Sequence, residues 1–139
     1  MSISYTASAT SSGGGRDGHV RSSDGQIDQP VAMPEAMGGN GQGTNPEQLF
    51  AAAFASCFHG ALRLAAKGAG IAVPDGTTIS ADVGIGPDDT SFGLVATLTG
   101  HFPGLDQASG DDLMQRAHQV CPYSKVTRGN LDVTLKATS

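Results

Sequence analysis

The sequence predicts an α+β fold in which helices pack against antiparallel β-sheet. Three observations favour this class. Two long segments beyond residue 76 alternate apolar and polar residues, as half-buried strands do. A segment before them is apolar at helical spacing, and a shorter helical segment with a final alternating segment follows them. The predicted order is therefore strands, long helix, two strands, short helix and strand.

Glycine-rich turns divide the first third of the chain into short β-like segments. Residues 3–10 are predicted to form a strand that ends at the turn 12–15. Residues 19–22 and 27–31 flank Ser23-Asp24-Gly25, and an Asp-Gly pair between such segments indicates a β-hairpin.

A glycine-rich loop at 38–43 separates these strands from the long helix. The loop lacks the Lys-Ser/Thr pair of a phosphate-binding loop, which argues against nucleotide binding. The helix is predicted to start at Pro46, because Asn45 can cap it and Glu47 suits the positive end of its dipole, and to run to Gly68-Ala69-Gly70. Apolar residues surround the helix almost completely, so it is predicted to be central and buried, with Cys57 near its middle.

The second half of the chain supplies the remaining elements. Segments 79–85 and 92–100 are predicted to form an antiparallel pair of strands. A shorter helix opens at Ser109 and is stopped by Pro122 immediately after Cys121. The last strand covers residues 131–136, where Leu, Val and Leu alternate with polar residues.

Composition limits the classes of function. At 139 residues, with 38% hydrophobic residues, 20 glycines and no Trp, the chain is expected to form a single domain over 1–139 with a small core. Such a core favours further burial in an oligomer. The net charge of −5 and eight scattered basic residues argue against nucleic-acid binding. No stretch approaches a membrane span, and the N-terminus lacks signal-peptide features, so a cytoplasmic protein is expected.

Cys57 and Cys121 are the main candidates for chemistry. Structural disulfides are rare in the cytoplasm, which favours a catalytic or sensing pair. A buried reactive thiolate needs a fixed cation, and Arg16 could supply it from its glycine-rich turn, with Glu47 orienting the guanidinium. Arg16 as an exposed turn residue and Glu47 as an ordinary helix N-terminal residue remain open alternatives.

The cysteines have other possible roles. Cys121 could attack an oxidised Cys57 to form a disulfide, or both could be inert buried thiols. His59 and His118 could complete a Cys2His2 metal site with them. However, residues two apart on a helix, such as Cys57 and His59, point to different faces, so no metal is expected.

Six short segments, in the same order along nearly the whole chain, match a known family. They are 5–10 (Tyr-Thr-Ala-Ser-Ala-Thr), 14–18 (Gly-Gly-Arg-Asp-Gly), 43–52 (Gly-Thr-Asn-Pro-Glu-Gln-Leu-Phe-Ala-Ala), 56–58 (Ser-Cys-Phe), 120–124 (Val-Cys-Pro-Tyr-Ser) and 127–130 (Thr-Arg-Gly-Asn). With these segments the chain resembles the organic hydroperoxide resistance (Ohr) proteins, a branch of the OsmC/Ohr superfamily of thiol peroxidases.

The resemblance implies a fold and a set of roles. Antiparallel sheets would pack around a long central helix that carries the active cysteine, in an intertwined homodimer with both active sites at the subunit interface. Cys57 matches the peroxidatic cysteine and Cys121 the resolving cysteine. Arg16 matches the arginine that stabilises the thiolate, and Glu47 the glutamate that holds this arginine. Phe54, where relatives often have Tyr, and His59 depart from the family pattern.

The resemblance also implies an activity. Organic and lipid hydroperoxides would be reduced to alcohols through a Cys57–Cys121 disulfide. Dihydrolipoamide or a lipoylated protein would then recycle the enzyme, without a cofactor or metal and without nucleic acid or membrane as a partner. Apolar residues such as Phe50, Phe54 and Phe58 would favour alkyl peroxides over hydrogen peroxide. A thiol redox sensor and a structural or metal-binding protein are the alternatives.

Overall fold

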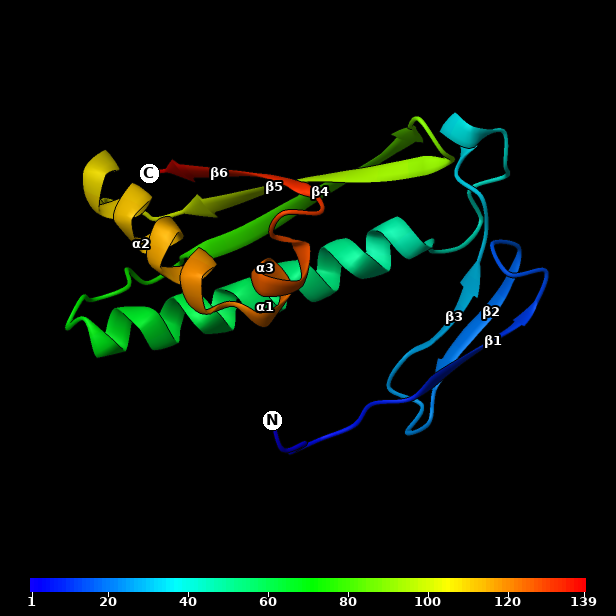
Figure 1. Ribbon diagram of the computed structural model, residues 1–139, viewed down its shortest axis with the longest axis horizontal. Helices are drawn as coiled ribbons and strands as arrows, with labels where there is room; N and C mark the ends of the chain where they lie inside the picture. Colours follow the sequence, from blue (N-terminus) through cyan, green and yellow to red (C-terminus); the bar gives the residue numbers. More distant parts are fainter. The chain divides into compact units, whose positions relative to one another are not determined.

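The computed structural model describes residues 1–139 as two compact units, residues 1–49 and 50–139 (Figure 1). Helix α1 (Pro46–Gly68) begins in the first unit and continues through the second. The two units are described separately below.

The first unit contains a three-stranded antiparallel sheet in the order β1-β2-β3, formed by β1 (Ala9–Gly13), β2 (Gly18–Ser22) and β3 (Asp28–Val31). The predicted β2–β3 hairpin is confirmed. The predicted strand at 3–10 is wrong over most of its length, because residues 3–8 form no strand. A β-strand requires a hydrogen-bonded neighbour, and β2 pairs only from Ala9 onward.

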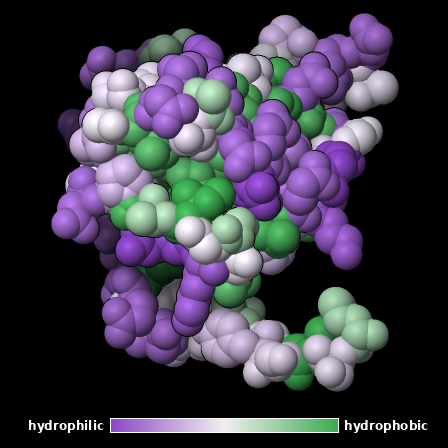
Figure 2. Space-filling view, turned by 90° about the vertical axis from the view of Figure 1, so that its left-hand side faces the viewer, coloured by the Kyte–Doolittle hydropathy of each residue, from purple (hydrophilic) through white to green (hydrophobic).

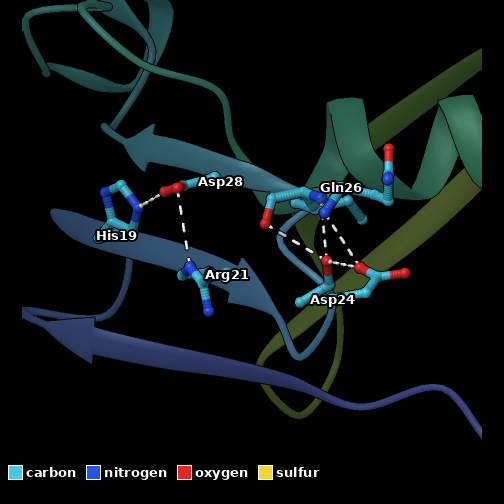
Figure 3. Close-up of polar contacts among 7 residues, drawn as sticks. His19, Arg21, Asp24, Gln26 and Asp28 are labelled. Atoms are coloured by element: carbon cyan, nitrogen blue, oxygen red, sulfur yellow. Dashed lines mark hydrogen bonds and ion pairs between the residues drawn. The ribbon is translucent and has the colours of Figure 1, made fainter.

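Polar contacts link the two strands and the turn of the β2–β3 hairpin (Figure 3). Asp28 on β3 accepts from His19 Nε2 at 2.5 Å and lies 3.7 Å from Arg21 Nε. In the turn, Asp24 Oδ1 accepts from the backbone N–H of Gln26 at 3.0 Å, which holds the pKa of Asp24 below its usual range. This side-chain-to-backbone bond is the reason that aspartate favours such turns.

A short 3-10 helix, η1 (Glu35–Met37), and the predicted glycine-rich loop lie between β3 and α1. The start of α1 is confirmed: Asn45 Oδ1 accepts from the backbone N–H of Gln48 at 2.8 Å, as a capping residue should.

Helix α1 is less buried than its sequence predicts. Its buried residues are Phe54, Phe58, Ala61, Leu62 and Ala66. Leu64, one of the apolar residues of this helix, has 69% of its surface exposed. By length and composition alone, α1 could cross a membrane. This differs from the expectation that no stretch of the sequence approaches a membrane span. The core helix of a soluble protein passes the same test of length and composition.

The second unit is built on the sheet β4-β5-β6, formed by β4 (Thr78–Pro87), β5 (Phe92–His101) and β6 (Asp132–Thr138). The predicted antiparallel pair β4–β5 is confirmed, with Val83 opposite Ala96. The sequence predicted an antiparallel sheet, but strand β6 runs parallel to β5. The long helical crossover between β5 and β6 makes this parallel pairing possible. The predicted α+β class is confirmed.

The crossover consists of α2 (Gln107–Val120) and α3 (Pro122–Thr127). Helix α2 begins before the predicted Ser109, because Asp106 accepts from the Ser109 N–H at 3.0 Å and caps the helix. Pro122 ends α2 as predicted, but it also opens α3, which the sequence reading missed. Proline suits the first position of a helix, where its missing N–H costs nothing.

Helices α1 and α2 cover one face of the β4-β5-β6 sheet, and the core lies between them (Figure 1). Its largest fully buried side chains are Phe54, Phe58, Leu62, Leu98, Phe102, Leu113 and Met114. Gly100 permits the close approach of α2 to β5, since a Cβ there would lie 2.6 Å from Met114 Sδ. The outer surface seen in Figure 2 is largely hydrophilic, with hydrophobic atoms in smaller groups between the polar ones.

We expect Phe58→Ala to lower the free energy of unfolding by about 3–5 kcal/mol, because it leaves a cavity at a side chain that is 0% exposed. Urea unfolding followed by circular dichroism measures the effect. Val126→Ala is the matched control, with 77% exposure and an expected change within about 0.5 kcal/mol. Equal losses in both variants would contradict this core.

Candidate functional site

Two free thiols meet inside the second unit. Cys57 lies on α1 and is half-buried, whereas Cys121 is fully buried at the junction of α2 and α3. The Cys121 thiol is directed at the sulfur of Cys57, with an Sγ–Sγ distance of 3.8 Å. These positions are 64 residues apart in the sequence, so the fold itself creates the pair.

The backbone around Cys121 explains how its sulfur reaches α1. Cys121 is the C-cap of α2 and the N-cap of α3, with an extended backbone (φ −65°, ψ 124°). A disulfide needs a sulfur–sulfur distance of about 2.05 Å, so an approach of about 1.8 Å would bring the pair to bonding distance. A single non-helical residue between two helices can take up such a shift with small changes of its own dihedral angles.

Burial dominates the acidity of Cys57. Desolvation raises the pKa of its thiol above the ordinary value, and the neighbouring Cys121 raises it further. The backbone N–H of Tyr123 opposes both by lowering it. None of these groups carries a positive charge, so the second unit alone favours the protonated thiol at neutral pH.

Arg16 and Glu47 form an ion pair within the first unit. Arg16 Nη1 and Nη2 donate to the two carboxylate oxygens of Glu47 at 3.0 and 2.8 Å, the bidentate geometry of strong Arg–carboxylate pairs. Arg16 stands on the turn between β1 and β2, where Gly15 has φ +77°. The Glu47 side chain is only 12% exposed, and its hydrogen bonds from Arg16 lower its pKa. Arg16 is therefore not a free turn residue.

The structure thus places the four predicted site residues in two pairs. Arg16 and Glu47 lie in the unit 1–49, and Cys57 and Cys121 lie in the unit 50–139. The thiol pair can form a disulfide. The guanidinium has five N–H groups and gives two to Glu47, so it retains donors for an anion.

The histidines considered as metal ligands do not assemble a site. No group of three or more His, Cys, Asp or Glu side chains is close enough to hold a metal ion. His59 Nε2 and His118 Nδ1 are buried without hydrogen-bond partners. Burial, and then the charge of Arg128, lower the pKa of His118.

Tyr123 lies close to the two thiols, and nothing in the sequence indicated its packing there. Its ring centroid lies 5.9 Å from that of Phe54 and 6.2 Å from that of Phe50. Recognising Pro122 as the first residue of a helix would have placed Tyr123 in the first turn of that helix. Phe54 and Phe58, expected near a substrate, are 0% exposed and belong to the core; only Phe50 is partly exposed.

A surface hollow of about 490 Å³ lies at one end of the sheet, away from the thiols. Its lining residues are Gly84, Ile85, Gly86, Pro87, Asp88, Gly93, Leu94, Val95, Asn130 and Asp132. Neither cysteine lines it, so it is not part of the candidate site.

Comparisons with known proteins agree on one family. The family model described as OsmC-like protein matches residues 39–136. An organic hydroperoxide resistance protein of Xanthomonas axonopodis pv. citri is 48% identical over 134 residues, covering 96% of this chain and 94% of that protein. The organic hydroperoxide resistance protein OhrB of Bacillus subtilis is 43% identical, with 95% and 96% coverage.

Solved structures show the same fold. An organic hydroperoxide resistance protein of Legionella pneumophila superposes with a TM-score of 0.92 at 40% identity, covering 99% of this chain and 100% of that one. The corresponding protein of Elizabethkingia anophelis gives a TM-score of 0.91 at 44% identity, with 100% and 99% coverage.

Proposed function

The chain belongs to the OsmC-like family, in its organic hydroperoxide resistance branch, and from this membership we propose that it is a cysteine-based peroxidase that reduces organic and lipid hydroperoxides to alcohols. The printed names of its relatives state resistance to organic hydroperoxides. The observation that supports a thiol mechanism is the 3.8 Å approach of Cys121 Sγ to Cys57 Sγ.

The proposed reaction begins at Cys57, the more exposed of the two thiols. Its thiolate attacks the distal oxygen of the peroxide, the O–O bond breaks, and the leaving alkoxide takes a proton and departs as the alcohol. Cys57 becomes a sulfenic acid. The Cys121 thiol attacks this sulfur, the disulfide forms, and water leaves.

The raised pKa of Cys57 means that this mechanism needs a cation. Arg16 is the proposed one, with Glu47 fixing its orientation through their bidentate pair. The free guanidinium donors would stabilise both the thiolate and the charge that develops on the peroxide.

The resemblance to the organic hydroperoxide resistance proteins implies a site shared between two copies of the chain. Glu47 and Cys57 lie on one continuous helix, ten residues apart, which corresponds to about 15 Å along the axis. We propose an intertwined homodimer in which residues 1–139 of each copy form a single domain and each active site combines Arg16 and Glu47 of one copy with the thiols of the other.

The proposed reductant is a small dithiol of the lipoyl type, either dihydrolipoamide or a lipoylated protein. Cys121 is fully buried and Cys57 only partly exposed, so a slender dithiol arm would reach the disulfide more easily than a folded protein surface. The reductant would attack by thiol–disulfide exchange and leave as its own disulfide. We propose a cytoplasmic location, where such reductants keep protein thiols reduced.

Stopped-flow oxidation tests the proposal. Fully reduced protein is mixed with tert-butyl hydroperoxide, a fatty-acid hydroperoxide or hydrogen peroxide, and free thiols are counted afterwards. Rapid loss of both thiols, faster with the organic peroxides, is the expected result. Slow loss with every peroxide would reject the peroxidase, and slow turnover with retained disulfide formation would favour a redox sensor.

A further inference from the structure

The carboxyl end of α2 contains a main-chain carbonyl that the helix itself cannot pair. Within an α-helix, each carbonyl accepts from the N–H four residues further along the chain. The Ala117 carbonyl accepts from the Cys121 N–H at 2.9 Å, but the His118 carbonyl would need the N–H of the next residue along. That residue is Pro122, which has no N–H. The His118 carbonyl therefore needs a donor from elsewhere in the fold.

Arg128 supplies this donor. It is the C-cap residue of α3, and its Nη2 donates to the His118 carbonyl oxygen at 2.6 Å. The bond is charge-assisted, and the guanidinium also lies at the negative end of the α2 dipole, where cations are favourable. The Arg128 backbone N–H donates to the Ser124 carbonyl at 2.9 Å, so its backbone is fixed at the end of α3. The ends of α2 and α3 are thus tied together.

Cys121 lies inside the loop that this bond closes. Helix α2 ends and α3 begins at Cys121, and the bond from Arg128 to His118 joins residues on either side of it. The backbone of Cys121 is extended, as expected for a residue before proline. Its sulfur is directed at the sulfur of Cys57, 3.8 Å away. A single residue between two helices is held only as firmly as the ends of those helices, so the bond limits the movement of the Cys121 sulfur.

We propose that Arg128 is a positioning residue for Cys121. Its guanidinium ties the end of α2 to the end of α3 and holds the Cys121 sulfur toward Cys57. The inference rests on the proposed function, in which this sulfur attacks the sulfenic acid of Cys57. A nucleophile held near its target reacts as if it were present at high local concentration. Arg128 therefore affects the closure of the disulfide, whereas Arg16 affects the attack on the peroxide.

Single-turnover oxidation by tert-butyl hydroperoxide tests this role. Arg128→Ala should slow the closure of the disulfide about fivefold, because one exposed hydrogen bond to a charged group has a modest net value. The sulfenic acid of Cys57 should persist correspondingly longer, as trapping by dimedone at successive times would show. The first oxidation of Cys57 should keep its native rate. Arg128→Lys retains a cation that can donate to a carbonyl at a helix end, and it should recover part of the closure rate.

Arg116→Ala is the matched control. Arg116 is an arginine of α2 that pairs with Asp112 of the same helix at 2.7 Å, so its loss removes an exposed cation without separating the ends of two helices. This variant should close the disulfide at the native rate. Circular dichroism shows that each variant is folded before the rates are compared.

A second measurement needs no peroxide. Each protein is equilibrated with mixtures of oxidised and reduced dithiothreitol, in which the two protein thiols become a disulfide as one dithiothreitol disulfide is reduced. Thiol counts then give the equilibrium constant for closure of the Cys57–Cys121 disulfide. Arg128→Ala should lower this constant about fivefold, because the released sulfur must first be brought into position. Arg116→Ala should leave it unchanged.

The dithiothreitol equilibrium separates this inference from the proposed function. A native equilibrium constant in Arg128→Ala would overturn the role of Arg128. An equal loss in Arg116→Ala would also overturn it, because the effect would then come from the lost positive charge. If the native protein reacts slowly with every peroxide, the peroxidase proposal fails, but the equilibrium constant still shows whether Arg128 positions Cys121.

Discussion

Cys57→Ser will abolish peroxide turnover, because a serine hydroxyl at neutral pH is neither ionised nor nucleophilic enough to replace a thiolate. Cys121→Ser will behave differently: one rapid oxidation of Cys57 per chain, followed by arrest. The 3.8 Å sulfur–sulfur distance supports the proposed role of Cys121 as the partner that closes the disulfide. Single-turnover stopped flow with a dithiol-coupled steady-state assay measures both rates.

Mass spectrometry identifies the arrested species. A sulfenic acid on Cys57, trapped by dimedone in Cys121→Ser and absent from Cys57→Ser, is the expected product. Both variants should keep the circular dichroism spectrum of the native protein, since serine is close to cysteine in size. Equal residual turnover in the two variants would contradict the division of roles.

Arg16→Ala will slow the oxidation of Cys57 by about 10²-fold, the usual effect of removing one strong donor from a developing anion. The physical reason is the raised pKa of Cys57, which leaves little thiolate at neutral pH without a nearby cation. The variant should therefore recover part of its rate as the pH rises. Arg16→Lys keeps the positive charge but loses the two parallel donors of the guanidinium. Its oxidation rate should therefore lie between the rates of the native protein and of Arg16→Ala.

Glu47 determines how the Arg16–Glu47 pair responds to low pH. Arg16 lowers the Glu47 pKa from its ordinary value of 4.5, so the pair is intact at neutral pH and is lost only as the pH falls below that value. Glu47→Gln keeps the size of the side chain and should reduce the rate less than Arg16→Ala, because the guanidinium loses its orientation but keeps its charge.

Mixed dimers test whether the site is shared. The Arg16→Ala and Cys57→Ser chains are co-expressed under two affinity tags, and their heterodimer is purified. If each site takes Arg16 from one copy and Cys57 from the other, one of the two sites contains both native residues. If both residues come from the same copy, neither site contains both. Recovered activity in the purified heterodimer is the expected result. An inactive heterodimer would place Arg16 and Cys57 of the same copy in one site.

Local signals in the sequence predicted the elements that depend on local interactions. The Asn45 cap, the Asp-Gly hairpin and the alternation of β4 and β5 all involve neighbours in the chain, and the structure confirms each. The strand at 3–10 failed because a strand needs a partner that its own residues do not specify. The predicted burial of α1 was partly wrong for a similar reason: a helix that is apolar all round does not show which side is covered, and Leu64 is exposed.

The candidate site could be predicted only in part. Composition and spacing identified two thiols, and the family resemblance assigned them roles, but neither showed that α3 exists. Pro122 was interpreted as a helix stop, although proline suits the first turn of a helix equally well. The packing of Tyr123 on Phe54 is a contact between residues far apart in the sequence, and no pattern of residue types reports it.

The parallel pairing of β6 with β5 has a consequence for biogenesis. Cys57 is synthesised early, on a helix that forms from local contacts, whereas Cys121 belongs to the crossover that is fixed only when β6 completes the sheet. Non-local pairings of this kind are slow folding steps. During that interval the thiols are apart, and a sulfenic acid on Cys57 has no partner to resolve it, so it is open to irreversible oxidation to the sulfinic acid. Under the proposed mechanism, a nascent chain is thus more sensitive to peroxides than the folded protein.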